Sequence, residues 1–282
     1  MRIDNLSADP SRFPRASILE GEGFVCYFGV PLIAKGLVKG VLEVFHRSPL
    51  DPVQEWLDFL YTLSGQAAIA IQDAQLFNNL QRSNFELLHA YDATIEGWSR
   101  ALDLRDRETE GHTLRVTEMA IRLGREFGLS DEELKYMRWG GLLHDIGKMG
   151  VPDSVLFKAD ALTNEEEQIM RKHPVYAHEM LSPIRYLKSA ATDIPYCHHE
   201  KWDGTGYPRG LKGEQIPLPA RLFAVADVYD AITSDRPYRG KWEKAKAVSY
   251  IREQAGFYFD PRIVEIFLQV VMEDDFDQHN EK

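Results

Sequence analysis

The pattern of apolar and polar residues near the N-terminus predicts a short β-hairpin. Residues 24–33 and 40–45 are rich in β-branched and aromatic side chains and are bounded by glycine and proline, as strands often are. Residues 34–39 between them are short enough for a hairpin or another short connection. We therefore predict a small β-containing domain over residues 1–62.

Apolar residues then recur at alternating steps of four and three along residues 63–100, as in the a and d positions of a heptad repeat. This a/d seam consists of Ala70, Ala74, Phe77, Gln81, Asn84, Leu88, Tyr91, Ile95 and Trp98, interrupted by two polar members that can set the register. The pattern predicts one long connecting helix. Two interpretations stay open: a dimeric coiled coil, or an amphipathic helix packed on its own domain.

Residues 101–282 are predicted to form a mainly helical domain. Two capping boxes mark helix starts, because a Ser or Thr is followed three residues later by Glu. They are Ser130 with Glu133 and Thr163 with Glu166.

Proline and glycine set further boundaries in this domain. The helix that begins after Ser130 is expected to continue through Ile146, and Pro174 is expected to begin a new helix. Residues 200–219 are rich in glycine and proline and are predicted to form a loop, followed by a helix over about 220–233. The expected class is α+β overall, with an all-α bundle preceded by a partial α/β segment and a long connecting helix.

Composition and charge narrow the functional classes. The formal net charge of −11 argues against general binding to a nucleic-acid polymer, which needs a basic face. A small anionic substrate stays possible, because bound metal ions can reverse the local field. No apolar run approaches the ~20 residues that span a bilayer, and the N-terminus lacks a signal-peptide pattern. We expect a cytoplasmic protein in which Cys26 and Cys197 are buried apolar residues.

Histidine and acidic residues gather in the helical part of the chain. Six of the nine histidines lie between residues 112 and 199, and most of them are close to carboxylates. Glu108 and His112 are four residues apart, which places them on one face of a helix. The other members of this group are His144, Asp145, His173, His198, His199 and Asp227.

A single histidine on an apolar face is usually a core residue, but eight imidazole and carboxylate groups cannot be buried together without compensation. Metal ions provide it. Nitrogen and oxygen ligands without thiolate suit iron, manganese or other octahedral divalent ions. Eight side chains exceed the need of one ion, so we expect two or three ions, bridged by a carboxylate such as Asp145. Such a cluster suits phosphodiester hydrolysis, because adjacent ions activate water and hold phosphate oxygens.

Lys148 lies four residues beyond His144 and is expected to face the same way if the helix continues. Its ammonium group could neutralise a phosphate oxygen or stabilise the leaving group. The alternative is a surface lysine at a helix end. Its closeness to the ligand pair favours a catalytic role for Lys148 beside Asp145.

Two motifs carry a specific family resemblance. Residues 144–148 (His-Asp-Ile-Gly-Lys) resemble the signature of the HD phosphohydrolase superfamily. Residues 198–208 (His-His-Glu-Lys-Trp-Asp-Gly-Thr-Gly-Tyr-Pro) resemble the extended motif of the HD-GYP family. Residues 217–221, 225–231 and 236–239 are also similar to segments of that family, and the resemblance covers about 97–270.

The resemblance implies an all-α HD-type bundle with a metal site in its core, which hydrolyses cyclic di-GMP to linear pGpG and often on to GMP. It places the metal ligands at Glu108, His112, His144, Asp145, His173, His198, His199 and Asp227, and the presence of Glu108 favours three ions over two. It also places Tyr207 beside a guanine, and Lys148, Arg236 and Arg239 near the phosphates. For the two arginines, a solvated loop is the alternative.

Residues 24–80 resemble the closing half of a GAF sensor domain. Residues 29–32, 40–44 and 65–71 carry this likeness. The first half of such a domain, which would supply much of a ligand pocket, is absent, so we expect a truncated domain without a competent sensor pocket. We still expect homodimerisation through the helix over residues 63–100.

Three functions are compared. A cyclic di-GMP phosphodiesterase is the leading hypothesis. The second is another HD-type phosphohydrolase acting on a different cyclic dinucleotide or a nucleotide, although the tyrosine–glycine loop argues against a plain nucleotidase. The third is a module that binds cyclic di-GMP and recruits other signalling proteins. Such docking, through the loop over residues 200–219, could accompany catalysis.

Overall fold

The computed structural model describes residues 1–6, 13, 21–106, 111–235 and 240–280. The chain divides into two compact units, Met1–His89 and Ala90–Lys282. A long helix, α1 (Gln54–Asp106), contributes residues to both units. The expected α+β class is confirmed.

The first unit contains a three-stranded antiparallel sheet in the order β1 (Arg2–Ile3), β2 (Cys26–Ala34) and β3 (Leu37–His46). The predicted hairpin is confirmed, with a shorter connection than expected. Its turn consists of Lys35 and Gly36, both with positive φ angles of 47° and 76°. Positive φ at both central residues matches the right-handed twist of the flanking strands.

One face of the sheet packs on the first turns of α1. Alternate residues of β2 point to this face, as the two-residue period of a strand requires. Cys26, Phe28 and Val30 form a buried cluster with Leu60 of α1, so Cys26 is the buried apolar residue that was expected.

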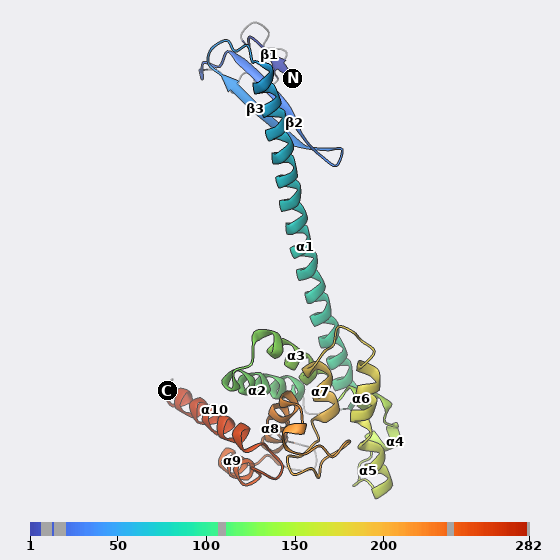
Figure 1. The fold of residues 1–282 in the computed structure, drawn as a ribbon. Coiled ribbons are helices and arrows are strands. Elements are labelled where there is room, and N and C mark those ends of the chain that lie inside the picture. The colour runs from blue at the N-terminus through green and yellow to red at the C-terminus, as the bar shows by residue number, and fades with distance from the viewer. Residues whose placement is uncertain (7–12, 14–20, 107–110, 236–239, 281–282) are drawn as a thin grey trace. The chain divides into compact units, whose positions relative to one another are not determined.

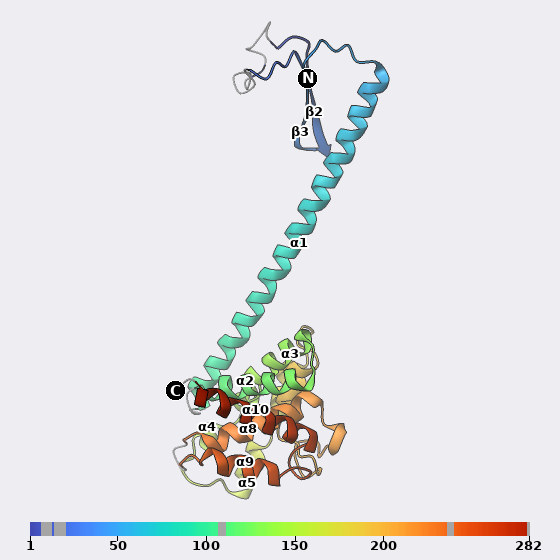
Figure 2. The same ribbon diagram turned by 90° about the vertical axis from the view of Figure 1, so that its left-hand side faces the viewer.

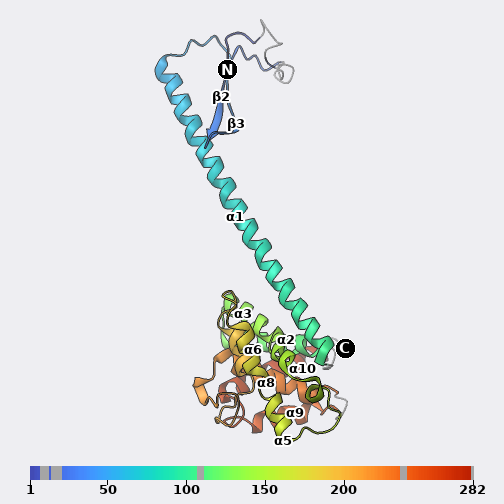
Figure 3. The same ribbon diagram turned by 90° about the vertical axis from the view of Figure 1, so that its right-hand side faces the viewer.

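The second unit is a bundle of helices. In all three views, α2, α8 and α10 lie side by side (Figure 1, Figure 2 and Figure 3). Cys197 is buried here. The elements are α2 (His112–Phe127), α3 (Asp131–Leu142), the 3-10 helix η3 (Ile146–Gly150), α4 (Asp153–Leu156), α5 (Asn164–Met170), α6 (His173–Leu181), α7 (Ala190–Cys197), the 3-10 helix η4 (Gly213–Gln215), α8 (Leu218–Thr233), α9 (Lys244–Glu253) and α10 (Pro261–Asn280).

Several predicted boundaries in this unit are confirmed. Both capping boxes form, at Ser130 and at Thr163, with the reciprocal bonds to Glu133 and Glu166. Pro174 lies in the first turn of a new helix, α6. None of the helices in the described part of the chain is long and apolar enough to cross a membrane.

The helix after Ser130 does not continue through Ile146, so this prediction is wrong. Helix α3 ends at Leu142, and His144 and Asp145 lie in the turn before η3. The amide of Ile146 donates to the carbonyl of Leu143 (3.0 Å), three residues back rather than four. The chain has therefore tightened from 3.6 to about three residues per turn.

The three-residue period of this turn gives it three different faces, because side chains at i and i+3 eclipse in a 3-10 helix. Asp145 and Lys148 share the first face, with 2.7 Å between the carboxylate Oδ2 and the ammonium Nζ. Gly147 belongs to the face against α6, where a methyl group would collide with the backbone of His173 and Ala177. Ala177 is fully buried at this contact.

The predicted helix over residues 63–100 exists but is longer at both ends. The last part of its a/d seam belongs to the second unit and packs inside that unit. Tyr91 stacks on Tyr186 with 4.0 Å between ring centroids, and Ile95 is 3% exposed. Further up the helix, Phe77 is 59% exposed. The amphipathic interpretation therefore describes the end of the seam, while the coiled coil stays a prediction for the exposed part.

The close approach of η3 to α6 yields a test of the fold. Gly147→Ala is expected to lower the free energy of unfolding by about 1–3 kcal/mol, because the added methyl group overpacks the contact. The matched control is Gly97→Ala on α1, where no atom beyond the adjoining residues of the helix itself lies within 4 Å of the new methyl group. It should leave stability unchanged or raise it by about 0.5–1 kcal/mol. Thermal unfolding followed by circular dichroism measures both, and equal melting temperatures for the two variants would contradict the packing argument.

Candidate metal centre

The ends of several helices bring the predicted ligands together. His112 and His173 begin α2 and α6, and His198 caps the end of α7. His144 lies in the turn before η3, and Asp227 lies within α8. Because these elements pack in one bundle, residues spread over more than a hundred positions of the chain meet in its core.

Two groups of candidate ligand atoms result. His112, His144 and Asp227 offer nitrogen and oxygen atoms that all lie within 4.8 Å of one another. The second group, which meets the same limit, consists of His173, His198 and His199. Three ligand atoms this close can share one ion, so each group is a candidate position for a metal ion.

Asp145 lies between the two groups. Its Oδ2 is 3.0 Å from Nε2 of His144 in the first group. Its Oδ1 is 3.3 Å from Nε2 of His173 and 3.8 Å from Nε2 of His198 in the second. One carboxylate thus directs one oxygen to each group, which is the geometry required of a bridging ligand.

Hydrogen bonds orient the imidazole rings toward this centre. In three of the histidines, Nδ1 bonds to a main-chain carbonyl, so the proton is on Nδ1 and the Nε2 lone pair is available for metal. The pairs are His144 with Gly141 (2.8 Å), His173 with Met170 (2.9 Å) and His198 with Ile194 (3.0 Å).

His112 is oriented instead by the carboxylate of Asp230, a residue that the sequence analysis did not single out. Its Nδ1 lies 2.7 Å from Oδ2 of Asp230, and its Nε2 is 3.5 Å from Oδ1 of Asp227. Asp230 also accepts from Nε of Arg115 (2.7 Å). The sequence held a signal, because Asp230 follows Asp227 and Arg115 follows His112 by three residues each, which places each pair on one helix face.

Burial controls the charge of these groups. Burial lowers the pKa of His173, lowers that of His198 well below its usual value and lowers that of His199 to about 3. For Asp145, burial alone would raise the pKa, but interactions with His144 and with the ammonium group of Lys148 outweigh burial and hold the pKa well below its usual range. Neutral imidazoles and an ionised carboxylate are the forms that bind metal ions.

A cavity of about 460 Å³ opens at the centre. Asp145 and Lys148 contribute to its wall, together with Tyr207 and Tyr258. The ring of Tyr207 stacks on His199 with 4.7 Å between centroids. Sequence reasoning did not single out Tyr258, which comes from the segment between α9 and α10 and has no motif of its own.

Residues of the glycine-rich motif shape its loop. Glu200 is 2% exposed and accepts from the amides of Arg209 (2.8 Å) and Leu211 (3.0 Å). Asp203 accepts from the amide and hydroxyl of Thr205. The structure therefore supports a role in loop conformation for both acids. Glu108, Arg236 and Arg239 lie outside the described residues.

The fold and the site together define a helical-bundle domain with a candidate metal centre made by imidazoles and carboxylates. The HD domain profile matches residues 96–263, and the chain belongs to this family. The GAF domain profile matches residues 1–71.

Named relatives agree with this assignment. The chain is 42% identical over 244 residues to the cyclic di-GMP phosphodiesterase response regulator RpfG of Xanthomonas campestris, covering 85% of this chain and 64% of the relative. It is 35% identical over 233 residues to the 3′3′-cGAMP-specific phosphodiesterase 2 of Vibrio cholerae, covering 82% of this chain and 43% of that relative. The chain thus spans less than two thirds of either relative.

A solved structure shares the fold. The cyclic GMP-AMP-specific phosphodiesterase V-cGAP3 of V. cholerae superposes with a TM-score of 0.52 at 22% identity, over 65% of this chain and 49% of that chain. The similarity supports the helical HD bundle.

The contact between His112 and Asp230 can be tested by Asp230→Asn. The amide is a weaker acceptor for Nδ1–H, so we expect metal affinity to fall about 10- to 100-fold. Titration of the metal-free protein with Mn²⁺ measures this. The control is Asp203→Asn, which removes a carboxylate of the loop and should leave metal affinity unchanged. Equal affinities in all three proteins would show that Asp230 does not support the ligand.

Proposed function

We propose that this protein is a metal-dependent phosphodiesterase that hydrolyses cyclic di-GMP to linear pGpG and on to GMP. The observation that carries the proposal is the place of Asp145 between two groups of candidate ligands. Two adjacent divalent ions suit hydrolysis of a phosphodiester. The identity of 42% with a relative named as a cyclic di-GMP phosphodiesterase supports this choice of substrate.

The donor set fits divalent ions such as iron or manganese, because it combines imidazole nitrogen with carboxylate oxygen and no thiolate. The residues proposed to hold them are His112, His144, Asp145, His173, His198, His199 and Asp227, with Glu108 as the further ligand for a third ion. When bound, these ions supply Lewis-acid activation of water and of the phosphate group.

The chain's own groups prepare the site for this chemistry. The buried histidines present lone pairs, and Asp145 contributes the negative charge that attracts cations to both positions. Lys148 lies on the cavity wall with its ammonium Nζ 2.7 Å from Oδ2 of Asp145, where it can compensate charge on a phosphate oxygen. The carbonyl anchors of the imidazole rings limit reorganisation during the reaction, because the rings are already aligned.

Substrate contacts are proposed for four residues. Tyr207 lies in the cavity wall and offers an aromatic surface to a guanine base. Lys148, Arg236 and Arg239 are proposed to bind the phosphates, for which the planar guanidinium group is well suited.

A second substrate has a specific observation in its favour. The relative from V. cholerae with 35% identity is named for 3′3′-cGAMP, which carries one adenine in place of a guanine. The two cyclic dinucleotides share the phosphodiester ring and differ in one base, so the metal centre alone does not discriminate between them. Discrimination would have to come from groups that contact the base.

We also propose that the protein acts in the cytoplasm as a homodimer through α1, with the loop over residues 200–219 available to dock other signalling proteins. The exposed a/d seam of α1 supports the dimer, because an isolated helix with a long apolar stripe gains stability by packing.

Two phenylalanines of α1 provide a matched test of the dimer. Phe77 belongs to the a/d seam and is 59% exposed, whereas Phe85 lies off the seam and is 62% exposed. Phe77→Glu is expected to convert the dimer to a monomer, because it places like charges opposite each other in the coiled coil. Phe85→Glu should leave the dimer intact. Sedimentation velocity measures both, and a monomeric parent protein or an equal effect of the two variants would rule out this seam.

The enzymatic proposal is tested by product analysis. The full chain, purified without oxygen and with its metal content measured, is incubated with cyclic di-GMP and separately with 3′3′-cGAMP. We expect linear pGpG and GMP from the first substrate. Asp145→Ala is expected to lose turnover by a factor of at least about 10³, because it removes the proposed bridge between the ions.

Metal removal provides the matching control. Chelation should abolish turnover and added Mn²⁺ or Fe²⁺ should restore it in the parent protein but not in Asp145→Ala. Absence of product from fully metallated protein that still binds cyclic di-GMP would refute the enzyme and favour a binding and docking module. Product formed only from 3′3′-cGAMP would show that this dinucleotide, rather than cyclic di-GMP, is the substrate.

A further inference from the structure

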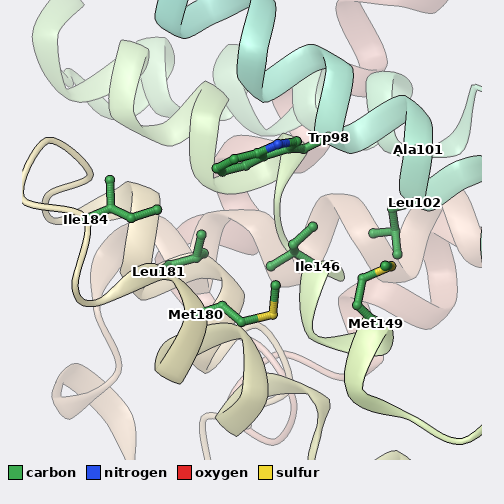
Figure 4. Close-up of a pocket in the computed structure, with 8 residues that line it drawn as sticks. All are labelled: Trp98, Ala101, Leu102, Ile146, Met149, Met180, Leu181 and Ile184. Atoms are coloured by element: carbon green, nitrogen blue, oxygen red, sulfur yellow. The ribbon is translucent and has the colours of Figure 1, made fainter.

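A second cavity of about 250 Å³ lies in the second unit, apart from the metal centre (Figure 4). Its wall comes from the last turns of α1, from η3 and from α6 with the segment that follows it. Figure 4 shows Ile146 between Trp98 above and Met180 below, with Met149 and Leu102 closing one side. The lining residues are Trp98, Ala101, Leu102, Ile146, Met149, Met180, Leu181 and Ile184.

The chemistry of the lining selects the kind of molecule that fits. Among the described residues, no charged side chain lines this cavity, and the indole N–H of Trp98 is its one polar side-chain group. Trp98, Met149 and Met180 are nevertheless 42%, 45% and 46% exposed, so large apolar surfaces face solvent around one concavity. Apolar surface gathered in this way marks a binding site more often than scattered exposed residues do.

The volume of the cavity further limits the molecules that can bind in it. An apolar cavity of about 150 Å³ holds benzene, so this one has room for a molecule of about ten non-hydrogen atoms. It is too small for a helix of another protein. The unbranched thioether side chains of Met149 and Met180 can adjust their rotamers to the outline of such a molecule.

The helix η3 separates this cavity from the metal centre. Ile146 and Met149 face the apolar cavity, whereas Asp145 and Lys148, each one position earlier, face the metal centre. A 3-10 helix places residues i and i+3 on one face, so the two pairs lie on neighbouring faces of a single turn. A shift of this turn therefore moves both walls together.

We propose that the apolar cavity binds a small uncharged apolar molecule and that this binding is coupled to metal binding through η3. A metal ion bound by Asp145 fixes the turn, and a molecule in the cavity then meets a wall that is already ordered. Binding of the second ligand then costs less conformational entropy, so each ligand raises the affinity of the protein for the other. The coupling rests on the metal centre of the proposed function, whereas binding in the cavity does not depend on catalysis.

The test uses 4-bromotoluene, an uncharged aromatic probe whose bromine quenches tryptophan fluorescence on contact. In the full chain we expect saturable quenching within the solubility of the probe, and a loss of that quenching in Trp98→Phe. The charged analogue 4-bromobenzoate should not bind. Ala101→Phe should abolish binding by filling the cavity from α1, while Ala93→Phe, which adds the same side chain at an exposed position of α1, should not.

The coupling is measured by repeating the titration in metal-free and Mn²⁺-saturated protein. We expect the probe to bind about fivefold or more tightly with Mn²⁺, and the Mn²⁺ affinity to rise by the same factor with the probe. Ala101→Phe should remove this linkage while it still binds Mn²⁺.

Three results would overturn the proposal. Quenching that persists in Ala101→Phe would place the probe elsewhere. Equal probe affinity with and without Mn²⁺ would disprove the coupling. Probe affinity that falls as protein concentration rises would show that a second copy of the chain fills the cavity. None of these readouts requires phosphodiesterase activity, so failure of the enzymatic proposal is distinguishable from failure of this one.

Discussion

The architecture of the second unit depends on one short 3-10 turn. With three residues per turn, consecutive residues of the segment that follows His144 point to three surroundings: the metal centre, an apolar cavity and the backbone of α6. In an α-helix, residues three positions apart are offset by about 60° around the axis, so Asp145 and Lys148, and likewise Ile146 and Met149, would align less closely than they do in this 3-10 turn. Gly147 is needed because only a residue without a side chain allows η3 to touch α6.

The centre itself is assembled from helix ends rather than helix faces. His112 and His173 lie at the first position of a helix and His198 at a C-terminal cap, where the chain can approach the bundle core end-on. Main-chain carbonyls that orient the rings of His173 and His198 come from residues three or four positions earlier. Orientation of these ligands is therefore encoded locally, and the bundle needs only to bring the helix ends together.

Many of the helix boundaries and the hairpin could be predicted from the sequence because short-range patterns encode them. The capping boxes at Ser130 and Thr163 and the hairpin connection within residues 34–39 were recognisable from neighbouring residues. Asp230 was missed because its partner His112 is 118 positions away, and such a pairing exists only after α2 and α8 have packed. The end of α3 was misplaced because apolar residues continue beyond Leu142, so the hydrophobic pattern does not reveal the change of helical period.

The hydrogen bond between His112 and Asp230 makes the two groups of candidate ligands chemically different. One group has the carboxylate of Asp227 and an imidazole that bonds to a second carboxylate, Asp230, whose pKa is lowered to about 2 although burial opposes this, because His112 and Arg115 hydrogen-bond to it. The other group offers three imidazoles, two of them anchored to neutral carbonyls. The first group of candidate ligand atoms therefore carries negative charge of its own, whereas the second relies on Asp145 for the nearest carboxylate. Mutation of Asp145 would leave the second group with nitrogen donors alone, but would leave the first group with a carboxylate.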